Sequence, residues 1–371
     1  MSFLRGRTVV AVEQAVAAPL CSMRLAQAGA EVIKIERPEG DFARGYDTAV
    51  AGQSSYFVWL NAGKKSVVLD LTRNDQVRIL RQLISRSDVL IQNLKPGAMA
   101  KLGLELQELH AELPSLISMS IAGFAPDGPG HQRKAYDLLM QAESGLSAIT
   151  GSPHAPGRVG VSLVDIATGQ YAYEAILGAL FERESSGHGA QLSVSLFDAV
   201  AQWLAVPYLL DRYGEAPPER LGLAHPGICP YGVFVAGCGR SFILSIQNQR
   251  EWERLCDLGM QRPELRLDPR CADNETRVAN REFVDGQVQQ AVSLMDYTQI
   301  QQRFDAADLA FAPVNAISDL KSHPDFHTLG VHVGGSLVQL PRVPGAVADP
   351  NIVNRVPALG AHTDEVLATL T

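Results

Sequence analysis

The stretch TVVAVEQAVAAPLCSMRLAQAGAEVIKIE, residues 8–36, decides the fold. Two short runs of apolar and β-branched residues, 8–12 and 31–36, flank a helical pattern that has Pro19 near its start and ends near Ala28. Proline is tolerated in the first turn of a helix, because the amide hydrogen that it lacks would have no partner there. The pattern therefore predicts a strand, a helix and a second strand, which together form one βαβ unit.

Strand and helix patterns keep alternating as far as residue 210. The sequence predicts further strands over 66–71, 88–92, 116–121 and 191–195, and further helices over 75–86, 97–112, 196–210 and after Asp165. Such alternation is typical of right-handed βαβ units, whose parallel sheet is covered by helices on both faces. The predicted class is α/β, with a Rossmann-like parallel-sheet large domain and a smaller α+β domain.

Several common motifs of α/β enzymes are missing from the chain. The first predicted strand leads into Glu-Gln-Ala-Val-Ala-Ala-Pro (13–19) instead of G-x-G-x-x-G, and neither G-x-x-x-x-G-K-[ST] nor G-x-S-x-G occurs. Metal-binding spacings of the H-E-x-x-H kind are absent as well. These absences argue against a dinucleotide site, a P-loop, a serine hydrolase and a metalloprotease.

The pattern divides the 371 residues into four parts. We expect the first part of the large domain over 1–213, a linker and active-site loop over 214–230, a small domain over 231–312, and a C-terminal return to the large domain over 313–371. The linker contains the stretch GEAPPER, and prolines interrupt the last part. We therefore expect an extended tail that ends in a short helix near 363–369.

Composition restricts the classes of function. The net charge of −8 argues against nucleic-acid binding, and no run of 18 apolar residues predicts a membrane span. The predicted strand at residue 8 leaves no room for a signal peptide, so we expect a cytoplasmic protein. Five cysteines without C-x-x-C spacing indicate reduced thiols and no metal site.

A candidate nucleophile lies in the stretch GRVGVSLVDIATGQYAYEAILGALFERESSGHGAQLSVS, residues 157–195. Asp165 stands there at the mouth of a predicted helix, where free N–H groups and the helix dipole are expected to keep its carboxylate ionised. Gly169 lies four residues later and would let another molecule approach the first turn closely. Taken alone, an aspartate before a helix is most often an ordinary N-cap.

Seven blocks of sequence, taken in order, resemble the family III coenzyme A transferases, the superfamily of formyl-CoA transferase, the carnitine CoA-transferases and α-methylacyl-CoA racemase. The blocks cover nearly the whole chain and are residues 17–44, 61–71, 88–104, 118–130, 135–151, 157–195 and 224–234. The resemblance implies two ring-shaped subunits that interlock as a homodimer. It also implies that CoA is a substrate, and that no cofactor is permanently bound.

The resemblance assigns the chemistry to Asp165. In this family the matching carboxylate attacks an acyl-CoA thioester, so that an acyl-aspartyl anhydride and then an aspartyl-CoA thioester form. Covalent catalysis of this kind divides one difficult exchange into easier steps. The residues that match the family's CoA-binding positions are Val16, Ala17, Arg37, Leu69, Asn93, Leu94, Ala98, Lys101, Lys134 and Tyr136.

One of these positions departs from the family's pattern, and two of them have an alternative explanation. Val16 stands where formyl-CoA transferase has a catalytic glutamine, which puts a formyl/oxalate exchange in doubt. Without the resemblance, Lys101 and Lys134 are equally explained as solvated surface lysines.

The substrate is inferred from the stretches 13–19, 40–47 and 225–231, which resemble family members that act on short dicarboxylic acids. These imply succinyl-CoA as the donor and itaconate, mesaconate or citramalate as the acceptor. A second carboxylate calls for a cation, and Arg44 and His225 are the candidates. Gly227 matches the family's flexible glycine-rich loop. The alternatives are a surface ion pair for Arg44 and a loop hydrogen bond for His225.

Three rival functions remain. A racemase has a histidine base in a G-H-D-I-N-Y context, where this chain has Tyr136, and a tyrosine is a poor base at neutral pH. Acyl transfer through Cys229, with His225 as its base, is the second rival. The third is a CoA-binding module without turnover.

Overall fold

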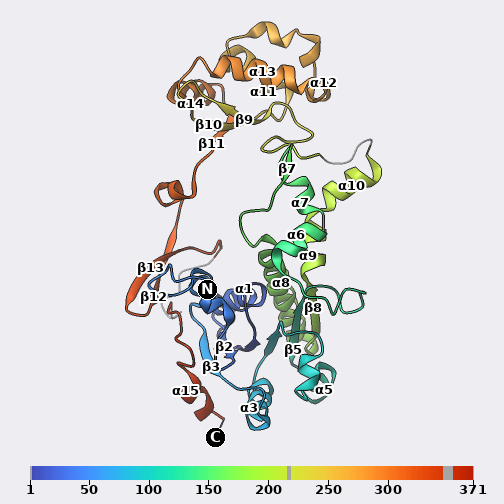
Figure 1. Ribbon diagram of the computed structural model, residues 1–371, viewed down its shortest axis with the longest axis vertical. Helices are drawn as coiled ribbons and strands as arrows, with labels where there is room; N and C mark the ends of the chain where they lie inside the picture. Colours follow the sequence, from blue (N-terminus) through green and yellow to red (C-terminus); the bar gives the residue numbers. More distant parts are fainter. Residues whose placement is uncertain (1, 215–218, 346–353, 371) are drawn as a thin grey trace. The chain divides into compact units, whose positions relative to one another are not determined.

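The computed structural model describes residues 2–214, 219–345 and 354–370 (Figure 1). The chain forms two compact units. Unit 1 comprises residues 1–146, 158–208 and 327–371, and unit 2 comprises residues 147–157 and 209–326. Each unit has its own hydrophobic core and is described by itself.

A six-stranded sheet forms the centre of unit 1, in the order β3-β2-β1-β4-β5-β8. Every neighbouring pair is parallel, which confirms the predicted α/β class. The order is that of a doubly wound sheet. Strands β2 and β3 follow on one side of β1, and the later strands, beginning with β4, follow on its other side. The strands are β1 (Thr8–Val12), β2 (Glu31–Glu36), β3 (Lys65–Val68), β4 (Val89–Gln92), β5 (Ile117–Ala122) and β8 (Gln191–Ser195).

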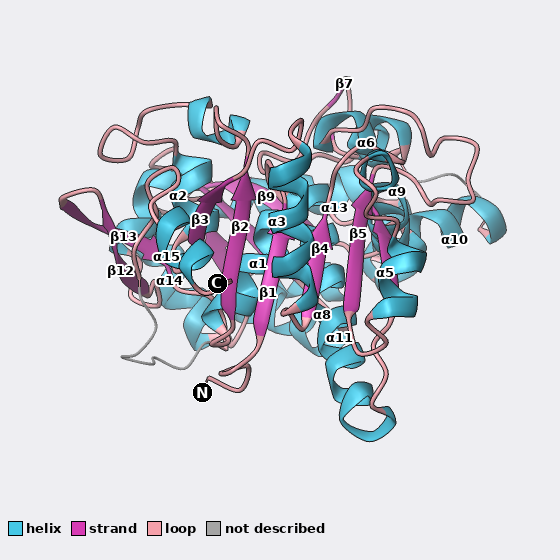
Figure 2. Cartoon of the chain, turned by 90° about the horizontal axis from the view of Figure 1, so that it is seen from below, coloured by secondary structure: helices cyan, strands magenta, loops and turns pink. Residues whose placement is uncertain are grey.

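Helices cover both faces of this sheet (Figure 2). Val9 and Ala11 of β1 pack on α1 and α8, whereas Val10 and Val12 belong to the core under α3 and α5. This alternation is expected for a strand that is buried on both faces. The helices of unit 1 are α1 (Ala17–Gln27), η1 (Phe42–Gly45), α2 (Ser55–Asn61), α3 (Asn74–Ser85), α4 (Ala98–Lys101), α5 (Leu106–Glu112), α6 (Asp137–Glu143), α8 (Leu163–Ser186), α9 (Leu196–Trp203) and α15 (Thr363–Ala368).

Two predicted helices are each divided in the structure. The helix predicted over 97–112 is α4 followed by α5, because Gly103 adopts a left-handed conformation with φ of +68° after α4. The helix predicted over 196–210 is α9 followed by α10 (Ala205–Tyr213). Pro207 lies in the first turn of α10 and has no N–H to continue the hydrogen bonds of α9.

The C-terminal segment was predicted to be extended, but it forms a hairpin first. Strands β12 (Thr328–Val333) and β13 (Ser336–Pro341) pair antiparallel around the two-residue turn Gly334-Gly335. A Gly-Gly pair between apolar runs is a known hairpin signal, and the sequence reading overlooked it. Pro350, one of the prolines on which the extended tail was predicted, lies outside the described residues.

The last helix, α15, lies against the outer edge of β3. Ser66 N–H donates to Nδ1 of His362 at 3.2 Å, and the N–H of His362 donates to the carbonyl oxygen of Ser66 at 3.0 Å. Val68 N–H donates to Oγ1 of Thr363 at 3.1 Å. These bonds satisfy backbone groups that an edge strand would leave open.

Unit 2 contains a three-stranded antiparallel sheet in the order β11-β10-β9, with helices packed around a core that includes Phe242, Trp252 and Phe304. Its elements are α7 (Leu146–Ile149, which begins at the boundary with unit 1), β6 (Gly151–Ser152), β7 (Ala155–Pro156), α10, β9 (Tyr231–Val235), β10 (Ser241–Ser245), α11 (Gln249–Arg254), η2 (Leu255–Gly259), η3 (Pro263–Arg266), η4 (Pro269–Cys271), α12 (Asn274–Ala279), α13 (Arg281–Val292), α14 (Tyr297–Ala306), β11 (Ala310–Pro313) and η5 (Ile317–Ser322).

The units differ from the predicted domain boundaries in three places. Residues 147–157 and 209–213 group with unit 2 and not with the large domain, and residues 313–326 group with unit 2 and not with the C-terminal return. The predicted linker over 214–230 includes residues 215–218, which lie outside the described residues.

Candidate active site

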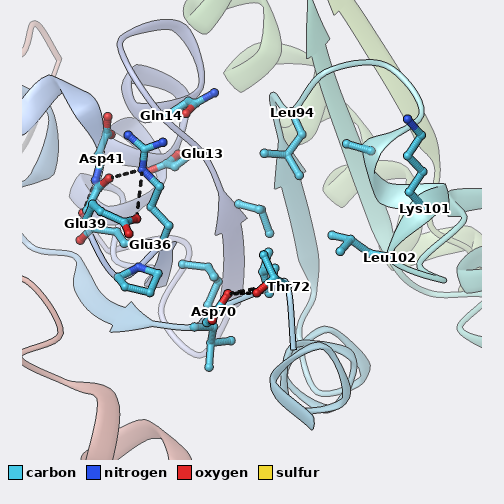
Figure 3. A pocket seen from close by; sticks show the side chains of 18 residues that line it. Glu13, Gln14, Glu36, Glu39, Asp41, Asp70, Thr72, Leu94, Lys101 and Leu102 are labelled. Carbon is cyan, nitrogen blue, oxygen red and sulfur yellow. Dashed lines mark hydrogen bonds and ion pairs between the residues drawn. The ribbon is translucent and has the colours of Figure 1, made fainter. Parts of the chain in front are cut away.

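A cavity of about 680 Å³ opens at the carboxyl ends of β1, β2, β3 and β4 in unit 1 (Figure 3). We call it the Arg37 cavity. It lies where the strand order reverses, which is the usual binding position in open α/β sheets. Five predicted CoA-binding residues line it, namely Arg37, Leu69, Leu94, Ala98 and Lys101.

The charges of the Arg37 cavity are unevenly arranged. Glu36 and Glu39 lie on one side, and Lys101 at the end of α4 lies across from them (Figure 3). Arg37 donates through Nε to the carbonyl oxygen of Gly40 at 2.9 Å. Lys101 is exposed and has no ion pair within the described part of the chain, so its ammonium group is available to an anion.

Beneath this cavity lies a cluster of buried charges that the sequence reading overlooked. Nζ of Lys34 is 2.8 Å from Oδ2 of Asp41, and Nζ of Lys64 is 2.8 Å from Oε1 of Glu13. Asp41 also accepts a hydrogen bond from Ala15 N–H at 3.1 Å. The cluster therefore fixes the turn that follows β1.

Asn93 holds the same turn from the other side of the reversal point. Its Oδ1 accepts from Gln14 N–H at 3.0 Å, and its Nδ2 donates to the carbonyl oxygen of Gln14 at 2.9 Å. Asn93 was predicted to bind CoA, but its amide is engaged with Gln14. Gln14 and Leu94 line both the Arg37 cavity and a second cavity, so the two cavities adjoin.

The second cavity, of about 540 Å³, contains the predicted nucleophile, and we call it the Asp165 cavity. All its lining residues belong to unit 1. The structure brings together here seven of the predicted site residues, namely Val16, Ala17, Asn93, Leu94, Lys134, Tyr136 and Asp165.

Asp165 is the third residue of α8, and Ser162 occupies the N-cap position. The carboxylate of Asp165 accepts no hydrogen bond and forms no ion pair with any described residue. Burial, and then the nearby charge of Asp137, raise the pKa of Asp165 to about 7. Burial and Asp137 therefore oppose the ionisation that the helix mouth was expected to favour, and that expectation stays a prediction.

Asp137 takes the capping role that was considered for Asp165. Its Oδ1 accepts from the N–H groups of Val164 at 2.7 Å and of Asp165 at 3.3 Å. Asp137 is buried at the start of α6, 28 residues before Asp165 in the chain. Local patterns relate residues three or four positions apart, so no sequence signal could have revealed this contact.

Gly169 permits a close approach, but the approaching group is α1. A Cβ atom at this position would lie 2.5 Å from the carbonyl oxygen of Ala17 and 3.0 Å from Cβ of Leu20. The expectation that Gly169 admits another molecule is therefore replaced by a packing role. The close contact places the start of α1, with Val16 and Ala17, beside the first turns of α8.

Two tyrosines that the sequence reading missed also line the Asp165 cavity. The rings of Tyr46 and Tyr56 meet edge to face at 5.5 Å, and the hydroxyl of Tyr56 lies 3.4 Å from Oγ of Ser162. Burial, then the charges of Asp41 and Asp165, raise the pKa of Tyr46 to about 12. Tyr46 therefore remains a neutral hydrogen-bond donor at physiological pH.

Four lysine and arginine side chains line the Asp165 cavity, and three of them are available to an anionic substrate. Arg133 is engaged with Glu143, whose carboxylate it contacts at 2.6 and 2.7 Å. Arg158 uses only Nε, which donates to the carbonyl oxygen of Val159 at 3.2 Å, and it has no ion pair among the residues that the structure describes. Lys95 and the predicted Lys134 are exposed.

The structure favours the structural alternative for Arg44. Its guanidinium donates two hydrogen bonds of 2.8 Å to Glu36 and covers the ring of Phe57 at 3.7 Å. Arg44 lines neither cavity. It is a half-buried pair and not a surface one, because Glu36 is fully buried.

His225 and Gly227 belong to unit 2, so their part in binding at Asp165 stays a prediction. The ring of His225 stacks on Tyr231 with centroids 5.3 Å apart, and its Nδ1 accepts from Gly227 N–H at 3.1 Å. His225 therefore does form the loop hydrogen bond that was considered as its alternative.

Cys229 is unsuited to the rival thiol chemistry. It is fully buried, and its Sγ lies 3.7 Å from Oδ1 of Asp285. Burial, and then Asp285, raise the pKa of Cys229 to about 12. A thiol in this setting is not a thiolate near neutral pH, so the cysteine alternative is disfavoured.

The described residues show neither a metal-binding cluster nor a membrane-spanning helix. No group of three or more His, Cys, Asp or Glu side chains is arranged to hold a metal ion. Among the described helices, none is both long enough and apolar enough to cross a bilayer.

Known proteins resemble this chain over nearly its whole length. A succinate–glutarate CoA-transferase of Agrobacterium fabrum is 32% identical over 99% of this chain and 95% of that protein. An acetyl-CoA:oxalate CoA-transferase of Acetobacter aceti is 36% identical over 78% of this chain and 74% of that protein. A solved CAIB/BAIF family protein from Brucella suis has a TM-score of 0.85 at 30% identity and covers 100% of this chain and 99% of its own.

The model of the family described as "CoA-transferase family III" matches residues 4–363. This match spans both units and both cavities. The chain therefore belongs to CoA-transferase family III.

Proposed function

We propose that this CoA-transferase moves CoA from succinyl-CoA to a short dicarboxylic acid through covalent intermediates on Asp165. One observation carries the proposal: the Asp165 carboxylate has no protein partner among the described residues and lies in a cavity adjoining the one that five predicted CoA-binding residues line. A carboxylate left without partners in a partly closed cavity is a candidate nucleophile.

The two cavities suggest how the donor binds. The nucleotide would occupy the Arg37 cavity, with its phosphates toward Lys101, and the pantetheine arm would pass Gln14 and Leu94, which line both cavities. The thioester would then reach Asp165.

The reaction proceeds in four transfers. An oxygen of Asp165 attacks the thioester carbonyl and the C–S bond breaks. This step releases CoA thiolate and forms a succinyl-aspartyl anhydride. The thiolate attacks the Asp165 carbonyl, which releases succinate and leaves an aspartyl-CoA thioester. The acceptor carboxylate attacks that thioester and expels the thiolate. The thiolate finally attacks the acyl carbon of the acceptor, which gives the product and restores Asp165.

Each transfer passes through a tetrahedral oxyanion, which hydrogen-bond donors must stabilise. The N–H groups of Val164 and Asp165 are occupied by Asp137. The start of α1 is the better source, because the first N–H groups of a helix lack partners within the helix. Val16 caps α1 without a side-chain hydrogen bond, and Ala17 lines the Asp165 cavity.

The acceptor is a C5 dicarboxylate in this proposal, such as itaconate, mesaconate or citramalate. The support is the similarity to the succinate–glutarate CoA-transferase, together with Arg158 of the Asp165 cavity, which has no ion pair with any described residue. Arg158 takes the place of Arg44 as the candidate for the second carboxylate, because Arg44 is bound to Glu36. His225, the interlocked homodimer and the cytoplasmic location remain predictions.

The test is an assay of purified protein with succinyl-CoA and a panel of acids: itaconate, mesaconate, citramalate, glutarate, oxalate and a monocarboxylate of similar length. We expect CoA transfer to C5 dicarboxylates above all others. Hydroxylamine added during turnover should mark Asp165 alone, as read by peptide mass. Transfer only between monocarboxylates would contradict the dicarboxylate proposal, and α-proton exchange in deuterated water without transfer would indicate a racemase.

A further inference from the structure

The first turn of α8 is held by a buried carboxylate from α6. Oδ1 of Asp137 accepts from Val164 N–H at 2.7 Å and from Asp165 N–H at 3.3 Å. Oδ2 of Asp137 accepts from Nε2 of Gln141 at 2.7 Å. The backbone that carries the nucleophile is therefore anchored to Asp137 directly.

The hydrogen bonds identify Asp137 as an ionised carboxylate. Gln141 is fully buried, and its Oε1 accepts from Val159 N–H at 2.9 Å, which turns its Nε2 donor toward Asp137. Asp137 thus faces three N–H donors, and a group that only accepts hydrogen bonds matches the ionised form. Its negative charge then lies beside the reacting carboxylate.

The other titratable groups that line the Asp165 cavity come from several elements. The acids and phenols are Tyr46, Asp47, Tyr56 and Tyr136. The basic groups are Lys95, His131, Arg133, Lys134 and Arg158. None of them forms an ion pair or a hydrogen bond with the carboxylate of Asp165 in the described chain. After burial, Asp137 is the group that raises the pKa of Asp165 to about 7.

We propose that Asp137 is a positioning residue that anchors the first turn of α8 and holds the Asp165 carboxylate beside a like charge, so that acylation of Asp165 relieves the repulsion. The ionised carboxylate is repelled and poorly solvated, whereas the anhydride and the aspartyl-CoA thioester are neutral at this position. The nearby charge therefore favours the covalent intermediates over the free carboxylate. This inference rests on the proposed function and names a residue that acts on its nucleophile.

The test compares Asp137→Asn with Gln141→Ala. Asp137→Asn removes the charge and keeps an oxygen that can accept from Val164, whereas Gln141→Ala removes one hydrogen bond of Asp137 and keeps the charge. We expect Asp137→Asn to shift the acidic limb of the pH profile of kcat/KM for succinyl-CoA downward by about one pH unit or more. Gln141→Ala should leave the limb where the wild type has it.

A second readout follows the covalent intermediate. Protein incubated with succinyl-CoA and no acceptor should contain several-fold less aspartyl-CoA in Asp137→Asn than in wild type, measured by intact mass after a rapid quench. If Asp137→Asn does not fold, Asp137→Ser serves in its place, because serine is neutral and caps helices well.

The outcomes separate this inference from the proposed function. An acidic limb and an intermediate level that match wild type in the folded neutral variant would overturn the role of Asp137, and so would an equal shift of the limb in Gln141→Ala. Full activity of Asp165→Asn would instead overturn the proposed function itself.

Discussion

Two carboxylates of unit 1, the buried Glu36 and the half-buried Asp165, have pKa values that are shifted in opposite directions. Burial raises the pKa of Glu36, but hydrogen bonds from Arg44 and the charge of Lys34 more than offset this and lower the pKa to about 2. Asp165 is half-buried and has no cationic partner among the described residues, and its pKa is raised to about 7. The presence or absence of cationic and hydrogen-bonding partners, and not burial alone, therefore distinguishes the two carboxylates.

The comparison separates structural from reactive acids. The carboxylate of Glu36 accepts hydrogen bonds from Arg44, Ser66 and the backbone N–H of Asp41, so it fixes the loop after β2. Asp165 leaves both oxygens unused by the described chain. A buried group without partners costs stability, and sites of catalysis commonly bear such a cost.

The sharpest way to break the comparison is to neutralise Asp165. Asp165→Asn should lower the CoA-transfer rate by about 10³-fold or more, because the amide cannot form the anhydride. Binding of CoA, measured by calorimetry, should persist. Asp198→Asn is a matched control in the first turn of α9. Oδ2 of Asp198 accepts from the hydroxyl of Ser195, whose Oγ accepts from the N–H of Asp198. Undiminished CoA transfer by Asp165→Asn would show that Asp165 is not the reactive carboxylate, provided that the intact mass of the variant excludes deamidation back to aspartate.

The next largest effect concerns a structural partner. Lys34→Met should cost about 3–5 kcal/mol in the free energy of unfolding, because Asp41 and Glu13 would be left buried with less compensation. Lys65→Met removes a partly exposed partner of Glu31 and Glu365 and should cost less than about 1 kcal/mol. Urea unfolding of both variants measures the difference, and equal costs would show that the buried cluster is dispensable.

A smaller effect is expected for Arg158, which we propose binds the second carboxylate of the acceptor. Arg158→Gln should raise the KM of a dicarboxylate acceptor by about tenfold, because an unpaired guanidinium that binds the distal carboxylate is lost. The KM of a monocarboxylate of the same length should change little. Arg133→Gln, whose guanidinium is engaged with Glu143, is the control and should change either KM by less than about twofold. Equal increases for both acids in Arg158→Gln would contradict this role.

The smallest expected effect is on stability against pH. The pKa of Asp165 is higher in the folded chain than its ordinary value of 3.8, so the folded state binds the proton more tightly. Its contribution to stability is therefore lost as the pH rises from about 4 to about 7. Asp165→Asn should have a larger free energy of unfolding than wild type at pH 8, measured by urea unfolding, and the difference should shrink toward pH 4. A constant difference across this range would mean that Asp165 titrates normally.

The sheet could be predicted because its signal is local. Apolar runs such as 8–12 and 31–36 fit strands that are buried on both faces, and the intervening Pro19 fits a helix start, so each segment carries its own information. The same local reading failed for the helix predicted over 97–112, because a single Gly103 can either continue or end a helix.

The site was only partly predictable, for a related reason. The resemblance pointed to Asp165 and to residues of both cavities, but not to the contacts between them. Asp137 reaches α8 from another helix, and Lys34 interrupts an apolar strand in a way that usually indicates a solvent-facing position. Burial, and then the charge of Asp137 from another helix, raise the pKa of Asp165, and no local spacing in the sequence records either cause.

The bonds from His362 and Thr363 to β3 have a consequence for biosynthesis. His362 follows Ser66 by 296 positions, so a nascent chain presents the flank of β3 unpaired until residues 354–370 have been synthesised. The chain therefore covers this edge of its sheet long after β3 itself has been made. Removal of residues 354–370 would leave an exposed, pairing-competent edge on unit 1.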